Sequence, residues 1–250
     1  MRAIRADTTA QRRLLDLQAV DSALAQLEHR RRTLPEHAEL SRLQVEQGSA
    51  GSDLVEAETR VSDLELEQER AESDLEPVRQ RLARNEKRIA DGTVADPKAL
   101  SSMVEEVAHL RRRIGDLEDA ELEVMEQLET ATARRAELQQ RVDELAARAV
   151  TLVGQRDARL HELAEEAGVR RAERERLVPE VPADLLALYT KLGASHNGVG
   201  AAELRQRRCT GCQLEVNAAE LREYAAAPAE EVLRCEECGR ILVRTAESGL

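Results

Sequence analysis

The residues of this sequence with the clearest chemistry are its four cysteines, which stand in two pairs near the C-terminus. Cys209 and Cys212 form one Cys-x2-Cys pair, and Cys235 and Cys238 form the other. A two-residue spacer lets both thiolates of a pair reach one ion, and zinc in structural sites takes four such ligands in a tetrahedron. The spacing therefore predicts one structural zinc ion (Zn²⁺) per chain, bound by all four thiolates.

A redox role for the two pairs is the alternative. A thioredoxin-like reading expects a single Cys-x2-Cys beside a βαβ pattern, and no such pattern accompanies these pairs. A site closed by four thiolates has no open coordination position, so it is not expected to be catalytic. Thiolates in metal-binding pairs, rather than in a disulfide framework, favour a reducing cytoplasm.

The rest of the sequence carries no catalytic motif. It has no Ser/His/Asp constellation and no phosphate loop of the G-x-x-x-x-G-K type. It has no Trp or Phe and only two Tyr, although enzyme cores of this length normally use several aromatic side chains. We therefore expect a protein that is not an enzyme and has no small-molecule substrate.

Charge and hydropathy limit the partners. The net charge of −12 opposes nonspecific binding to DNA or to an acidic membrane surface. The longest apolar runs are far too short to cross a bilayer, so no membrane association is expected. Charged residues make up 34% of the chain, which together with its Ala, Glu, Leu and Arg content is typical of a coiled coil.

Two long helical patterns are separated by a short run of turn formers, residues 91–97. Gly92 can end one helix, while Asp96 can cap the next and Pro97 can begin it. Twelve of fifteen seam positions between residues 40 and 89 are apolar at 3,4 spacing, as are thirteen of fifteen between residues 103 and 152. The patterns predict a long antiparallel coiled-coil hairpin over residues 1–180, with partner numbers summing to roughly 188.

Irregularities interrupt both predicted arms. Pro35 breaks the first arm, and a stutter between residues 152 and 163 falls at about the same height in the second. The same pairing places Gln68 level with Glu121 as a polar layer in the seam.

The last part of the chain, residues 181–250, has a different pattern. A short amphipathic helix begins at Ala183, and a second small helix over residues 218–224 is capped by Asn217. Short strand-like runs surround the cysteine pairs. The sequence thus predicts a mostly α protein whose hairpin is followed by a linker helix and a small four-cysteine zinc ribbon.

The order of these parts resembles the bacterial C4-type zinc-ribbon, coiled-coil proteins. The resemblance rests on the hairpin pattern, the Val-Pro-Ala-Asp-Leu-Leu-Ala-Leu-Tyr segment beginning at Val181, Cys-Thr-Gly-Cys at Cys209 and Cys-Glu-Glu-Cys-Gly-Arg-Ile-Leu-Val at Cys235. It implies that the four cysteines are the zinc ligands. It also implies a cytoplasmic factor that acts through contacts with nucleic acid or protein.

Arginines flank the cysteine pairs and form a candidate site for nucleic acid. They are Arg205, Arg207, Arg208, Arg234, Arg240 and Arg244. Phosphate contact is one interpretation, and a solvated surface of arginines paired with glutamates is the other. Residues 201–250 hold seven Arg and nine Glu, a formal charge of −2, and no Phe or Trp for base stacking.

Two acids at the hairpin turn, Asp91 and Asp96, form a second candidate site. A hairpin with an acidic tip plus a zinc module resembles the factors that enter the secondary channel of RNA polymerase. The alternative is that both residues only cap helices.

The leading hypothesis is a non-enzymatic adaptor or regulator. Its ribbon would bind RNA, DNA or a transcription-related protein, and its coiled coil would be a spacer or docking surface. The alternatives are a scaffold that binds only proteins and a secondary-channel factor. Monomer and dimer both remain open.

Overall fold

The computed structural model describes residues 4–250 and confirms the predicted fold class. Its helices are α1 (Thr8–Arg32), α2 (Pro35–Ala90), α3 (Pro97–Leu177), the 3-10 turn η1 (Val178–Glu180), α4 (Ala183–Ser195) and α5 (Ala218–Ala226). Its strands are β1 (Ala201–Arg205), β2 (Arg208–Cys209), β3 (Leu233–Arg234) and β4 (Ile241–Arg244). Contacts divide the chain into two compact units, Ala38–Val153 and the combination of Met1–His37 with Gly154–Leu250.

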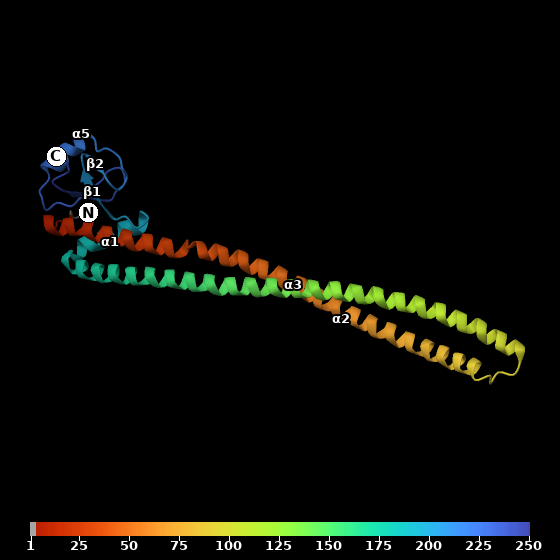
Figure 1. Ribbon diagram of the computed structural model, residues 1–250. Helices are drawn as coiled ribbons and strands as arrows, with labels where there is room; N and C mark the ends of the chain where they lie inside the picture. Colours follow the sequence, from red (N-terminus) through yellow and green to blue (C-terminus); the bar gives the residue numbers. More distant parts are fainter. Residues whose placement is uncertain (1–3) are drawn as a thin grey trace. The chain divides into compact units, whose positions relative to one another are not determined.

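The first of these units is a helical hairpin made of α2 and α3 (Figure 1). Gly92 ends α2 with a φ of +62°, a conformation that glycine adopts without strain. Asp96 accepts hydrogen bonds from the backbone N–H groups of Lys98 at 3.2 Å and Ala99 at 3.3 Å. Pro97 is the first residue of α3. The turn predicted over residues 91–97 is confirmed, with the cap where the sequence placed it.

Ion pairs on the two flanks of the helix contact fix its register. The residue numbers sum to 187 in Glu39–Arg148, Glu46–Arg141 and Arg81–Glu106. They sum to 197 in Arg79–Glu118 and Glu86–Arg111. In an antiparallel coiled coil the apolar seam lies midway between its two charged flanks. Seam residues at the same height, which we call level partners, therefore have numbers that sum to 192, the mean of 187 and 197. Leu43 then faces Ala149, and Ala50 faces Val142; all four belong to one apolar cluster.

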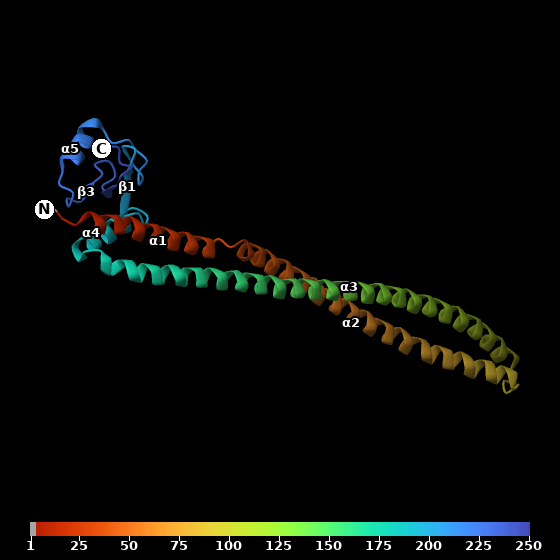
Figure 2. The ribbon, with the colours of Figure 1, turned by 60° about the vertical axis from the view of Figure 1, so that its left-hand side comes forward.

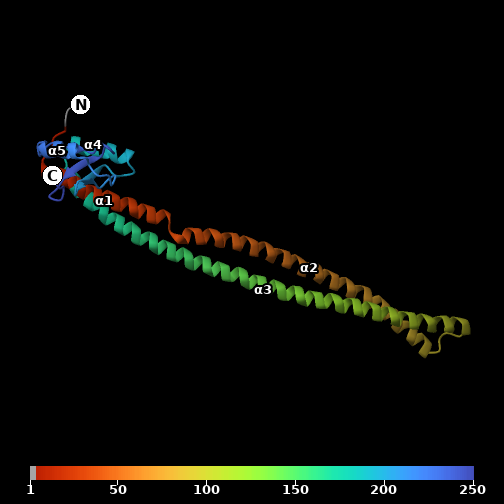
Figure 3. The same ribbon diagram turned by 90° about the horizontal axis from the view of Figure 1, so that it is seen from above.

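The predicted sum of roughly 188 is therefore wrong by about one helical turn. The prediction placed the fold at the middle of the turn sequence, but α3 begins further out than α2 ends, as Figures 1 and 3 show. The predicted polar layer fails for the same reason. Gln68 is level with Val124, not Glu121, and its amide donates to Glu72 of its own helix at 3.1 Å.

This register predicts a specific crosslink. Cysteines replacing Leu75 and Leu117, which are level in the seam, should form a disulfide within one chain under mild oxidation. Cysteines replacing Leu66 and Glu126 are equally level but lie on outer faces, so they should stay reduced. Non-reducing electrophoresis of both variants beside the unsubstituted chain reads the result. A crosslink in the outer pair but not in the seam pair would contradict the register.

The second unit begins with α1, which a short break separates from α2 (Figure 3). Thr33 ends α1, with its backbone N–H and its hydroxyl both donating to the carbonyl of His29. Pro35 is the first residue of α2. The predicted interruption at Pro35 is confirmed. Proline lacks the N–H that a helix interior uses, whereas it fits the first turn of a helix.

One apolar core joins α1 to α4 and to the sheet. Leu14 and Leu17 of α1, Leu185 of α4 and Ile241 of β4 are fully buried in it. Figure 2 shows α4 beside α1, below the ribbon. Gly200 lies so close to α4 that a Cβ there would stand 2.4 Å from the Tyr189 carbonyl oxygen. The N-terminal helix α1 therefore shares a core with α4 and the sheet of the ribbon.

A polar cluster ties three helices of this unit together. Asp21 of α1 accepts from the Tyr189 hydroxyl of α4 and from Arg174 Nε of α3, both at 2.7 Å. Burial and the hydrogen bond to Asp21 raise the pKa of Tyr189, so its hydroxyl remains a donor. The division of domains at residue 180 remains a prediction. In the structure, α1 and the end of α3 belong to the same compact unit as the ribbon.

The ribbon contains a four-stranded sheet in the order β2-β1-β4-β3. β1 runs parallel to β4, and the two outer pairs are antiparallel. Asn217 caps α5 by accepting from the backbone N–H groups of Ala219 and Glu220, as predicted. The two outer strands end at the two cysteine pairs, so the sheet determines where the pairs meet.

Candidate metal centre

Each cysteine pair occupies a tight turn at the end of a short strand. Cys209 is the last residue of β2, and its carbonyl accepts from the Gln213 N–H at 2.8 Å. The Cys235 carbonyl, just after β3, accepts from the Gly239 N–H at 2.7 Å, and Gly239 has a φ of +70°. The two turns are therefore alike in hydrogen bonding, which directs both pairs of thiols toward one point.

The four thiols lie close enough to share one ion. All four Sγ atoms lie within 4.8 Å of one another, and Cys209–Cys238 and Cys212–Cys235 are each 3.9 Å apart. Tetrahedral zinc with Zn–S bonds of about 2.3 Å places its sulfurs about 3.8 Å apart. The geometry fits the predicted ion, and the centre is a structural zinc site of four thiolates.

The surroundings of the thiols differ in how strongly they favour ionisation. Burial raises the pKa of Cys209 and of Cys235. Burial acts in the same direction on Cys238, but hydrogen bonds from Arg240 outweigh it and lower the pKa of Cys238 to about 7. A divalent cation is needed to hold all four groups as thiolates, which is the role that zinc has in such sites.

Three of the six candidate arginines donate hydrogen bonds to backbone carbonyls of the ribbon and of the loop just before it. Arg234 donates twice to the Gly239 carbonyl, at 2.9 and 2.8 Å, across the second cysteine turn. Arg240 donates to the Val199 carbonyl at 3.0 Å. Arg244 contacts five carbonyls, those of Tyr224, Ala227, Pro228, Ala229 and Glu231. These three side chains hold loops together.

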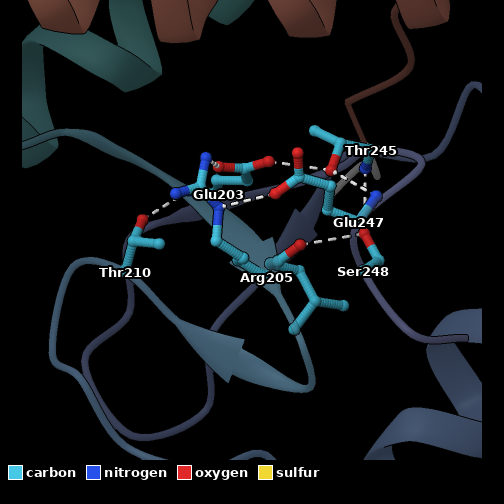
Figure 4. Close-up of polar contacts among 7 residues, drawn as sticks. Glu203, Arg205, Thr210, Thr245, Glu247 and Ser248 are labelled. Atoms are coloured by element: carbon cyan, nitrogen blue, oxygen red, sulfur yellow. Dashed lines mark hydrogen bonds and ion pairs between the residues drawn. The ribbon is translucent and has the colours of Figure 1, made fainter.

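The other three lie around the β1–β2 turn and are exposed. Arg205 forms ion pairs with Glu203 at 2.9 Å and Glu247 at 3.0 Å, and Figure 4 shows it between the two carboxylates. Arg208 has a long contact of 3.9 Å with Glu215, and Arg207 donates only to the Gly249 carbonyl at 3.2 Å. The structure thus brings Arg205, Arg207 and Arg208 together, but the two glutamates neutralise the charge of Arg205.

The acids at the hairpin tip have different local roles. Asp96 is the N-cap of α3, whereas the Asp91 backbone N–H donates to the Lys87 carbonyl and continues the end of α2. The tip around them is not acidic overall. Residues 77–115 contain nine Lys and Arg against five Asp and Glu, a formal charge of +4.

Sequence reasoning missed the residue that supports the second cysteine pair. Tyr224 of α5 is buried, and its hydroxyl donates to the Arg234 carbonyl at 3.0 Å, next to Cys235. The available signal was that Tyr224 is the one aromatic residue among the last fifty. A lone aromatic in a small module usually marks its core, because it buries the largest area.

None of the helices in the described part of the chain has an apolar stretch long enough to cross a membrane. Residues 17–197 match the CT398-like coiled coil hairpin domain, and residues 208–242 match the C4-type zinc ribbon domain.

Several bacterial proteins are similar to this chain over almost its whole length. An uncharacterized protein of Mycobacterium tuberculosis is 32% identical over 241 residues, covering 96% of this chain and 98% of that protein. A solved structure from Mycobacterium smegmatis has 34% identity and a TM-score of 0.83, covering 96% and 100% of the two chains. CT398 from Chlamydia trachomatis, at 16% identity and a TM-score of 0.67, covers 95% and 98% and shares the fold.

Proposed function

The chain belongs to the CT398-like coiled-coil hairpin family and carries its C4-type zinc ribbon, and from this premise we propose that it is a non-enzymatic adaptor that binds a protein partner through its hairpin. The ribbon is a zinc-stabilised module in this proposal, not a catalytic one. A reducing cytoplasm is the compartment that suits it, since the four thiolates must stay available to the metal.

The observation that supports this proposal is that the ribbon arginines already have partners within the chain. Each of the six candidate arginines has a carbonyl or carboxylate partner among the described residues. A phosphate would have to displace these partners, and a zinc ion with four thiolates adds −2 to a module that already carries −2. These charges favour a protein partner over a nucleic acid at the ribbon.

Binding of RNA or DNA is the second candidate function, and one observation favours it. Arg207 has no carboxylate partner among the described residues, and its neighbour Arg208 has only a long one. Any phosphate contact is therefore expected at the β1–β2 turn and not across the whole arginine set. The secondary-channel alternative has less support, since the hairpin tip has a net charge of +4.

Affinity capture with nuclease separates the two candidates. Tagged full-length protein, purified from its native cytoplasm with and without nuclease, should retain the same protein partner in both samples. A variant carrying Arg207→Ala and Arg208→Ala should retain it as well, and it controls for nucleic-acid bridging. Loss of the partner after nuclease treatment, together with loss in the arginine variant, would replace the adaptor proposal by nucleic-acid binding. Capture of nothing in either sample would contradict both.

A further inference from the structure

An apolar groove lies on the hairpin, along one side of α3. Its volume is about 650 Å³, and its apolar lining comes from α3, with Gln68 contributed by α2. The lining side chains that matter here are Leu122, Met125, Leu128, Ala133 and Ala136. Leu122 is 57% exposed and Met125 is 44% exposed, and the two side chains lie together in this groove. Apolar side chains exposed as a group, rather than singly, mark a candidate interaction surface. No described residue of the hairpin covers this surface.

A line of ion pairs along the hairpin ends at the groove. Along this flank of the hairpin, pairs that sum to 197 join Arg79 to Glu118 and Glu86 to Arg111. The next two positions on this flank, whose numbers also sum to 197, pair Glu72 with Met125 and Glu65 with Thr132. Both glutamates thus face a residue that cannot neutralise them. A cation from another molecule would complete the line.

The same part of the hairpin holds the negative charge of the chain. Residues 61–76 of α2 and the level residues 116–131 of α3, which we call the acidic belt, contain fourteen Asp and Glu against one Arg. Their formal charge is −13, compared with −12 for the whole chain, so the remainder sums to +1. Among the described residues, Glu118 alone of these carboxylates has an ion-pair partner.

We propose that the groove on α3 binds an amphipathic helix of a partner protein, with apolar residues on one face and Lys or Arg along both edges. This inference rests on the proposed adaptor function and gives it a site and a partner chemistry. The apolar face would cover Leu122 and Met125. The basic edges would meet Glu65 and Glu72 on one side and the belt carboxylates of α3 on the other.

The shape and chemistry of the groove suit a helix. Its lining spans Leu122 to Ala136, about four turns or roughly 21 Å of α3, which is the length of a short recognition helix. Thr132, Ala133 and Ala136 are small, so another backbone can approach closely at one end. Met125 at the other end adapts to differently shaped apolar side chains. A docked helix would make this stretch a three-helix coiled coil.

A synthetic peptide tests the site on the zinc-loaded full-length protein. The probe is a fluorescent helix of about 18 residues, with apolar residues at i, i+3, i+4 and i+7 and Lys or Arg elsewhere. A second peptide keeps the apolar positions and replaces every base by Glu. Fluorescence anisotropy should show binding of the basic peptide and none of the acidic one, because the acidic belt repels it.

Variants on exposed positions locate the binding. Leu122→Ser with Met125→Ser should weaken binding by about tenfold, since the peptide then loses most of its apolar contact. The matched control is Val104→Ser with Val150→Ser, two exposed valines of α3 outside the groove, and it should bind as the unsubstituted chain does. Glu65→Gln with Glu72→Gln should weaken binding and flatten its salt dependence, whereas Glu144→Gln with Glu175→Gln should do neither.

The outcomes separate this site from the adaptor function. Equal binding to the groove variant and its control, equal binding of both peptides, or no binding to the unsubstituted chain would overturn the groove. Self-association of the chain that disappears in the groove variant, measured by sedimentation velocity, would make a second copy the occupant and overturn the proposal too. Nuclease-resistant capture that survives in the groove variant would also reject the groove while leaving the adaptor function intact.

Discussion

Cys212→Ser should leave the chain without its zinc ion and unfold the ribbon, while the helical signal of the hairpin stays almost unchanged. The site has no spare ligand, since its four thiols lie within 4.8 Å of one another and are all the cysteines of the chain. Structural zinc sites contribute about 10–16 kcal/mol of apparent binding free energy, which for a small module is folding free energy. The nine-residue α5 is the one α-helix of the ribbon, so circular dichroism should change little.

Metal analysis and limited proteolysis check this expectation. The unsubstituted chain should contain one zinc per molecule and resist cleavage between Ala201 and Arg244. Cys212→Ser should contain none and be cut there. Glu236→Gln, an exposed position inside the second cysteine turn, is the matched control and should keep both its zinc and its resistance. A Cys212→Ser protein with one tightly bound zinc would contradict the four-thiolate site.

The zinc centre and the hairpin turn were predictable because each depends on neighbours in the sequence. A two-residue spacer is enough to place two thiolates on one ion. Gly92, Asp96 and Pro97 likewise determine the end of one helix and the start of the next through backbone geometry and a local cap. Both features therefore appeared in the structure at the predicted residues.

The register of the hairpin could not be read from its turn alone. Every apolar seam repeats in each heptad, so pairings one turn apart bury similar side chains. The choice is made by pairs distant in sequence, such as Glu39 with Arg148 and Arg79 with Glu118. The loop also accommodates helices that end at different heights. The predicted contact between Gln68 and Glu121 failed for this reason.

The roles of the arginines could not be predicted from the sequence either. In the sequence, Arg207 and Arg244 are both basic residues near a cysteine pair. In the structure, Arg207 is exposed at a turn, whereas Arg244 is half-buried among carbonyls at the end of α5. The sequence around Arg244 does not predict its five carbonyl partners, because they come from the end of α5 and the loop that follows it.

Arg244→Ala is accordingly expected to destabilise the ribbon, by about 2–3 kcal/mol, and not to act by removing a phosphate contact. Its guanidinium donates to five carbonyls between Tyr224 and Glu231, at 2.6 to 3.1 Å, and these oxygens would lose a charged donor. Arg244→Lys should recover only a small part, because an ammonium group cannot reproduce the planar fork. In urea, the midpoint for zinc release to a chromogenic chelator should fall by about 1 M.

Arg222→Ala provides the matched control for this measurement. Arg222 is exposed on the same helix α5, and its loss should leave the midpoint of zinc release unchanged. The comparison separates the two interpretations of the arginine set. If Arg244→Ala released zinc at the same urea concentration as Arg222→Ala and instead weakened binding of RNA or DNA, Arg244 would be a phosphate contact. Earlier zinc release with unchanged binding would make it a structural clamp, which is what its five carbonyl partners indicate.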